Sequence, residues 1–205
     1  MDHSEGPNPR IETGLLKGMN LEVAPGVVTR PTGAKVRAAV LNALQADLPG
    51  AKVLDLFAGT GALGLEAVSR GACSARFVEK DRRALQALEK NVGEAKRRLA
   101  KQGKSEVGLS VVAQDVTLLL SQNSSAASDS RLIFDVAWAD PPWDEVSALA
   151  PVLLKFLAPQ VAIGGVFVLE SGDGGEDITP FHGDGWDLTK SKTYGKTRIT
   201  VYRRV

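Results

Sequence analysis

Residues 53–64 read Val53-Leu54-Asp55-Leu56-Phe57-Ala58-Gly59-Thr60-Gly61-Ala62-Leu63-Gly64, an apolar run that passes directly into a glycine-rich turn. The apolar run predicts a buried strand, and the Gly-x-Gly-x-x-Gly spacing predicts a tight turn that opens a helix. From Lys52 onward, apolar strands alternate with helical patterns. This alternation predicts an α/β fold with a doubly wound, mostly parallel sheet.

The expected elements follow one another with short connections. They are a helix over 33–47 capped by Thr32, a strand to Phe57, a helix over 62–70, a strand over 75–79, a long helix from Asp81, strands over 109–113 and 132–138, a helix over 146–157, a strand over 161–170, and strands near 186–188 and 197–202. The last two strands are expected to pair as an antiparallel edge. Residues 1–9 are interpreted as a polar tail, 10–32 as a small β-hairpin, 33–205 as the main domain and 121–131 as a Ser-rich surface loop.

Composition restricts the classes of protein to consider. The chain has 205 residues, 43% hydrophobic content and a formal net charge of +1, which suits one well-buried domain. No apolar run reaches the length of a membrane span and the N-terminus lacks signal-peptide features, so we expect a cytoplasmic protein without membrane contact, and a monomer. One cysteine, Cys73, excludes an intramolecular disulfide, and His3 and His182 show no ligand spacing, so no metal is expected.

A second motif, Asp140-Pro141-Pro142-Trp143, directly follows the apolar run 132–138. A carboxylate and a carbonyl that a proline pair keeps rigid can accept both hydrogens of an exocyclic amine, and an indole can stack on a flipped-out base. The plainer alternative is a strand that ends in prolines and an acidic turn. The position favours the first interpretation, because open α/β sheets bind ligands at the carboxyl ends of their strands.

Three acids follow three successive predicted strands. Asp55 precedes the glycine turn, where its charge would repel a pyrophosphate but attract the ammonium of a methionine group. Glu79 is expected to accept ribose hydroxyls and Asp115 an adenine amine, with Val116 packed on the ring. Thr60 and Lys80 belong to the same two loops and are included in the expected cofactor site with Gly59, Gly61 and Asp140. Each acid alone is more typical of a helix N-cap or a solvated turn residue, but capping alone does not readily produce three acids at successive strand ends together with the glycine loop.

Charge is segregated along the chain. Residues 80–104 carry nine basic and three acidic residues, and residues 188–205 carry six basic and none acidic, whereas 129–187 carries eleven acids against two bases. Such segregation indicates a positive face for a polyanion, although charged helices are commonly just solvated.

The chain resembles the bacterial methyltransferases that modify a guanine N2 amine of small-subunit ribosomal RNA, the RsmD family, almost from end to end. The segments that carry the resemblance are Lys17-Gly18, Thr29-Arg30-Pro31-Thr32, Val36-Arg37, Leu41-Asn42, 54–67, Ser69-Arg70-Gly71-Ala72, Phe77-Val78-Glu79, Asp140-Pro141-Pro142 and Tyr194-Gly195. The glycine loop and the Asp-Pro-Pro motif occur in many methyltransferases, and the Thr-Arg-Pro-Thr run narrows the family.

The resemblance implies a Rossmann-like, class I S-adenosylmethionine-dependent methyltransferase with a seven-strand sheet and a small N-terminal hairpin, acting on an assembling small ribosomal subunit. It places Asp55, Gly59 and Gly61 at the methionine group, Glu79 at the ribose, Asp115 at the adenine, and Asp140 with Pro141 at the target amine. Its RNA side would include Arg10, Lys17, Arg30, Lys35, Arg37 and Lys196.

The alternatives that stay open are of two kinds. Adenine N6 or cytosine N4 of RNA or DNA, or a protein amide, is a rival target within the same chemistry. Trp143 stands where the family usually has tyrosine, which bears on the choice of base. From other classes, the rivals are an NAD-dependent oxidoreductase built on the same glycine loop and a non-catalytic RNA-binding factor.

Overall fold

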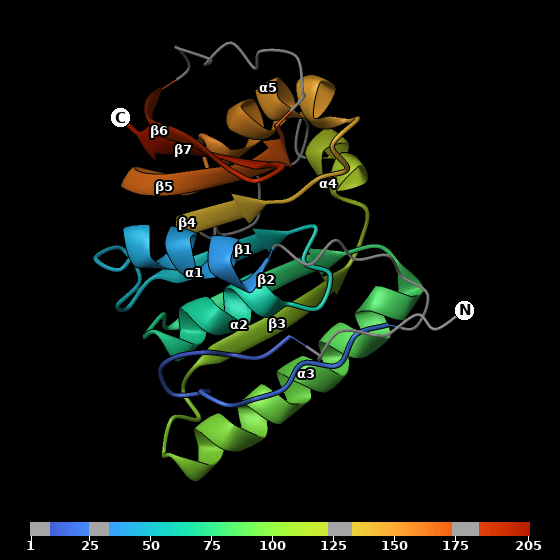
Figure 1. Ribbon diagram of the computed structural model, residues 1–205, viewed down its shortest axis with the longest axis vertical. Helices are drawn as coiled ribbons and strands as arrows, with labels where there is room; N and C mark the ends of the chain where they lie inside the picture. Colours follow the sequence, from blue (N-terminus) through green and yellow to red (C-terminus); the bar gives the residue numbers. More distant parts are fainter. Residues whose placement is uncertain (1–8, 25–32, 123–132, 174–184) are drawn as a thin grey trace.

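The computed structural model describes residues 9–24, 33–122, 133–173 and 185–205. Seven strands form one sheet in the order β3-β2-β1-β4-β5-β7-β6 (Figure 1). The strands are β1 (Lys52–Leu56), β2 (Ser74–Glu79), β3 (Gly108–Ala113), β4 (Phe134–Ala139), β5 (Val161–Gly172), β6 (Trp186–Tyr194) and β7 (Thr197–Arg204). The first five strands pair in parallel, and β7 runs antiparallel to both β5 and β6. The predicted fold class and its antiparallel edge are confirmed.

Helices cover both faces of the sheet (Figure 1). The helices are α1 (Ala34–Ala43), α2 (Ala62–Ser69), α3 (Arg82–Lys101), α4 (Val116–Gln122) and α5 (Val146–Leu157). Val53 belongs to a buried cluster with residues of α1, α2 and α3, whereas its neighbour Leu54 belongs to a second cluster with residues of α4 and α5. Successive strand side chains point to opposite faces, so the central strands are apolar on both sides and their runs are continuous rather than alternating.

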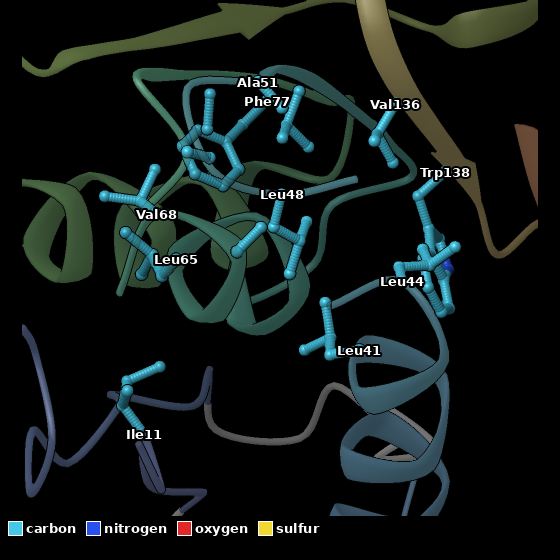
Figure 2. Close-up of a cluster of buried hydrophobic side chains, with 14 of the residues drawn as sticks. Ile11, Leu41, Leu44, Leu48, Ala51, Leu65, Val68, Phe77, Val136 and Trp138 are labelled. Atoms are coloured by element: carbon cyan, nitrogen blue, oxygen red, sulfur yellow. The ribbon is translucent and has the colours of Figure 1, made fainter. Parts of the chain in front are cut away.

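The first cluster joins the N-terminal segment to the sheet. Ile11 of that segment belongs to the same buried cluster as Leu41 of α1, Leu65 of α2, Phe77 of β2 and Trp138 of β4, and Figure 2 shows it below Leu65. Ile11, Leu16, Met19 and Leu21 are each 0% exposed. The segment is therefore part of the core rather than a loose appendage.

The predicted N-terminal hairpin is a loop with one antiparallel bridge, between Arg10 and Asn20. Its backbone is fastened to α2 and α3 by buried polar side chains. Leu16 N–H donates to Ser69 Oγ over 2.8 Å, and Glu22 N–H donates to Asn91 Oδ1 over 2.8 Å. These side chains satisfy buried backbone amides and hold the segment 9–24 against the two helices.

Helix α3 follows the predicted amphipathic stripe. Leu88, Val92, Ala95 and Leu99 are buried at helical spacing. Asp81 caps its first turn by accepting from Arg83 N–H and Ala84 N–H over 2.9 and 2.8 Å.

The remaining boundaries differ from expectation at three places. Helix α1 ends at Ala43 rather than 47, and β6 continues to Tyr194 rather than 188. Helix α4 was not predicted, and it includes residues 121 and 122 of the expected loop. The rest of that loop, 123–131, and the proposed cap Thr32 lie outside the described residues.

Among the described helices, none is both long and apolar enough to cross a membrane. Within the same ranges, no group of three or more His, Cys, Asp or Glu side chains is arranged to hold a metal ion.

Candidate active site

A hollow of about 430 Å³ opens at the carboxyl ends of β1, β2 and β4. In open α/β sheets this edge is where ligands bind. The loop after β1 and the Asp140-Pro141-Pro142-Trp143 motif, which we call the clamp, are far apart in sequence, and both line the hollow. Of the expected cofactor and clamp residues, those in the lining are Asp55, Gly59, Thr60, Glu79, Lys80, Val116, Asp140, Pro141, Pro142 and Trp143.

The turn after β1 is shaped by unusual backbone at Phe57 and by close packing at Gly64. Phe57 has φ +61°, a left-handed conformation that is rare for a bulky residue and is concentrated at functional sites. A Cβ on Gly64 would lie 2.4 Å from Phe77 Cε1 and 3.1 Å from Asp55 Oδ2. Gly64 therefore lets α2 approach the sheet, whereas Gly59 borders open space on the ligand side. Phe57 lines the hollow and was not predicted as a site residue.

Asp55 is buried at the bottom of the turn, with 2% of its surface exposed. Its Oδ2 accepts from Gly64 N–H over 3.0 Å. Burial, opposed by that hydrogen bond and reinforced by the nearby charges of Asp140 and Glu79, raises the pKa of Asp55 from 3.8 to about 8. The carboxyl group is consequently neutral at pH 7, and a bound cation would favour its ionised form.

Glu79 braces the glycine turn. Its Oε2 accepts from Gly59 N–H over 2.8 Å, and its Oε1 accepts from Lys80 N–H and Asp81 N–H, both over 2.8 Å. A carboxylate has about four acceptor sites, so it can still receive a hydroxyl from a ligand. The ribose role stays a prediction.

Asp115 lies at the start of α4, beside the hollow, and its adenine role stays a prediction. Its Oδ1 accepts from Thr117 N–H over 2.9 Å and Thr117 Oγ1–H over 2.7 Å, at the start of α4, and its Oδ2 accepts from Lys80 Nζ over 3.0 Å. These bonds lower the pKa of Asp115, first through Thr117 and then through Lys80. Asp115 is not among the lining residues, whereas its neighbours Val116 and Gln114 are. Sequence reasoning missed Gln114, although it follows the third strand directly.

The clamp motif leaves the end of β4 with Pro141 buried and Pro142 exposed. The indole of Trp143 packs on the end of β5, because a Cβ on Gly172 would lie 2.7 Å from Trp143 Cε3 and 3.1 Å from Cδ2. The absence of a side chain at Gly172 therefore makes the room that this large ring occupies. Sequence reasoning gave no role to Gly172.

The six basic residues expected on the RNA side fall into three groups. Arg10, Lys17, Lys35 and Lys196 are exposed, and Arg30 lies outside the described residues. Arg37 is buried at 4% exposure, which corrects the expectation that it is a surface contact. Its charge is compensated internally by Glu66, whose Oε2 lies 3.7 Å from Arg37 Nε.

The arrangement suits a ligand with an ammonium group at one end and a nucleoside at the other. The site pairs a buried carboxyl group beside a glycine turn with a strand-end acid, Glu79, that has spare acceptor capacity. The arrangement fits a dinucleotide less well. Dinucleotide-binding folds usually have the strand order 3-2-1-4-5-6, whereas here the antiparallel β7 lies between β5 and β6.

Comparisons with known proteins agree with this geometry. The family model described as "Conserved hypothetical protein 95" matches residues 9–203. The chain is similar to the "Ribosomal RNA small subunit methyltransferase D" of Escherichia coli K12, at 30% identity over 99% of this chain and 93% of the relative. It is also similar to the "Putative rRNA methyltransferase YlbH" of Bacillus subtilis 168, at 30% identity over 95% and 98% of the two chains. The solved structure of the "putative methyltransferase yhhF" from Escherichia coli superposes with a TM-score of 0.74 at 30% identity, covering 96% of this chain and 97% of that one.

Proposed function

We propose that this chain transfers a methyl group to RNA. The chain belongs to the family described as conserved hypothetical protein 95, the RsmD-type methyltransferases that its sequence resembles, and the proposal proceeds from that membership. In this proposal, S-adenosylmethionine is the cofactor, and the acceptor is the exocyclic N2 amine of a guanine in small-subunit ribosomal RNA. One observation carries it: the turn after β1 and the Asp140-Pro141 clamp line the same hollow of about 430 Å³. A methyl donor in the turn would thus face an amine in the clamp.

The chain's residues mainly position the reactants. S-adenosylmethionine supplies a methyl group bonded to a sulfonium, which a nitrogen displaces in line. An aromatic amine is a weak nucleophile, because its lone pair is delocalised into the base. Asp140 and the carbonyl of Pro141 would accept its two hydrogens, favour a pyramidal nitrogen and stabilise the positive charge that develops there. Since that nitrogen becomes acidic after transfer, water can take its proton and no strong base is needed.

The remaining parts of the site have supporting roles. Asp55 would hold the ammonium of the methionine group, and Glu79 the ribose hydroxyls. Trp143, packed on Gly172, would stack on the base. The exposed Arg10, Lys17, Lys35 and Lys196 would meet phosphates of the RNA.

The choice of guanine rests on the family resemblance, and the choice of ribosomal RNA on the names of the relatives. A nucleoside mass-spectrometric map of ribosomal RNA, compared between a strain with the gene and one without it, tests both. We expect one N2-methylguanine to disappear from the small-subunit RNA and to return with the wild-type gene but not with Asp140→Ala.

The same purified protein, incubated with labelled S-adenosylmethionine and small subunits lacking the modification, should restore that nucleoside. Loss of an N6-methyladenine or N4-methylcytosine instead would replace the target base. An unchanged map together with no transfer in vitro would contradict the methyltransferase function.

A further inference from the structure

Arg37 is a charged side chain in the wall of the hollow. It lies on α1, lines the hollow and is 4% exposed. Its Nη2–H donates to the carbonyl of Arg10 over 3.0 Å, and its Nε lies 3.7 Å from Glu66 Oε2. Two neighbours therefore fix the guanidinium in place, yet the residue still borders the space that a ligand would fill.

The charges around the hollow are unbalanced. The described lining residues include five acids, namely Asp55, Glu79, Asp81, Asp140 and Asp144, against two bases, Arg37 and Lys80. The methionine group of S-adenosylmethionine carries a carboxylate as well as an ammonium. A carboxylate brought into a site this acidic needs a cation beside it, because an unpaired charge is costly to desolvate.

Of the two bases, Lys80 is engaged at the nucleoside side. Its Nζ lies 3.0 Å from Asp115 Oδ2, and it directly follows Glu79, the expected ribose residue. A carboxylate at Lys80 would also lie beside the Glu79 carboxylate. Arg37 is also paired, with Glu66 Oε2 3.7 Å from its Nε, but its guanidinium carries five N–H donors and can receive a ligand carboxylate as well.

Helix α2 contacts both Arg37 and Asp55, which line the same hollow. Gly64 N–H donates to Asp55 Oδ2 over 3.0 Å, and Glu66, two residues further on, is the residue that pairs with Arg37. Gly61 caps this helix without a side-chain hydrogen bond. The positive end of the helix dipole adds to the attraction for an anion at this end.

We propose that Arg37 binds the α-carboxylate of the methionine group, so that Asp55 and Arg37 together recognise the two charges of an amino-acid head group. This inference rests on the proposed cofactor but is independent of which base is methylated. It makes Arg37 part of the cofactor site rather than of the RNA surface.

Calorimetric titration of Arg37→Gln with three ligands tests it. The ligands are adenosylhomocysteine, which has ammonium and carboxylate; decarboxylated S-adenosylmethionine, which keeps the ammonium; and 5′-methylthioadenosine, which has neither. Loss of a charge-assisted pair is expected to weaken adenosylhomocysteine by about 10- to 100-fold while changing the other two by less than about 3-fold. Lys155→Gln, an exposed lysine on α5, is the matched control and should leave all three affinities unchanged.

Two results would overturn the inference. Equal weakening of all three ligands would mean that Arg37 shapes the wall without meeting the carboxylate. An unchanged adenosylhomocysteine affinity would mean that the carboxylate lies elsewhere. If Arg37→Gln fails to fold by circular dichroism, Arg37→Lys serves instead, and it must weaken adenosylhomocysteine selectively. Absence of adenosylhomocysteine binding to the wild type would contradict the proposed cofactor rather than this assignment.

Discussion

Replacing Asp55 by Asn should stabilise the empty protein and abolish its affinity for the cofactor. The carboxyl group is 2% exposed, and its pKa is raised from 3.8 to about 8, chiefly by burial. Between these values the folded chain binds a proton that the unfolded chain has released, so the free energy of unfolding falls as pH rises. Asn has a similar shape, can accept from Gly64 N–H, and has no charge to desolvate.

The magnitude follows from linkage. Stability associated with a neutral Asp55 is fully present below about pH 4 and is lost at about 1.4 kcal/mol per pH unit until about pH 8. From pH 4 to pH 7 the wild type should therefore lose about 4 kcal/mol relative to Asp55→Asn. Asp55 therefore lowers the stability of the fold near neutral pH although cofactor binding needs it, a trade-off that is common at active sites.

Urea unfolding of both proteins at a series of pH values between about 5 and 8 measures the difference directly, because all other titrating groups cancel. Asp144→Asn, an exposed carboxylate on the rim of the same hollow, is the matched control and should show no growing difference. Calorimetry in buffers of different ionisation enthalpy should show release of about one proton when adenosylhomocysteine binds the wild type at pH 7, because its ammonium draws Asp55 into the ionised form. A wild-type to Asp55→Asn difference that is flat with pH would refute the reasoning, since it would mean that Asp55 is ionised in the empty protein.

Three further substitutions separate the parts of the site. Asp140→Ala should abolish transfer in a single-turnover assay while leaving adenosylhomocysteine affinity within about 3-fold, since Asp140 is assigned to the amine rather than to the cofactor; full activity would contradict the clamp. Gly64→Ala should lower the free energy of unfolding in urea by about 1–3 kcal/mol, because its Cβ would lie 2.4 Å from Phe77. Gly93→Ala, at a helical position with open space around it, should raise the free energy of unfolding by about 0.5–1 kcal/mol. Equal effects of the two substitutions would contradict the packing role of Gly64. Gly172→Ala should displace the indole of Trp143 and raise KM for RNA without altering cofactor affinity. In a Trp143→Ala background, the same substitution at Gly172 should no longer change KM. Additive effects of the two substitutions on KM would exclude the coupling.

The part of the fold that is strongly buried could be predicted from the sequence, and the weakly buried part could not. Strand β1 is a continuous buried apolar run, and helix α3 has buried apolar residues at helical spacing, so the sequence pattern predicted both elements. Residues 190–193 of β6 are exposed and polar on a sheet edge, and they carry no alternation that would extend the strand beyond 188. Helix α4 has seven residues and an exposed Leu118, which is too short and too mixed for a helical period to emerge.

The site shows a similar division. The strand-end positions of Asp55, Glu79 and Asp140 follow from topology, which the glycine loop and the alternation of elements predict. The burial of Arg37 depends on Glu66, a partner on another helix, and nothing local in the sequence distinguishes it from the exposed Lys35. The left-handed backbone at Phe57 and the packing of Trp143 on Gly172 likewise depend on tertiary contacts.

The three strand-end acids, which look equivalent in sequence, differ in the partners that the fold gives them. Glu79 accepts three backbone amides, whereas Asp115 accepts from Thr117 and Lys80, which lower the pKa of its carboxyl group. Asp55 accepts one amide and is buried, so its ionised form depends on a cation brought beside it. The cofactor's ammonium would provide that cation, while the carboxylate beside it would complete the pairing of Arg37. Binding of the cofactor would therefore give the buried Asp55 a cation and bring a carboxylate to Arg37, which gives a physical reason for an acid to be buried under a glycine turn.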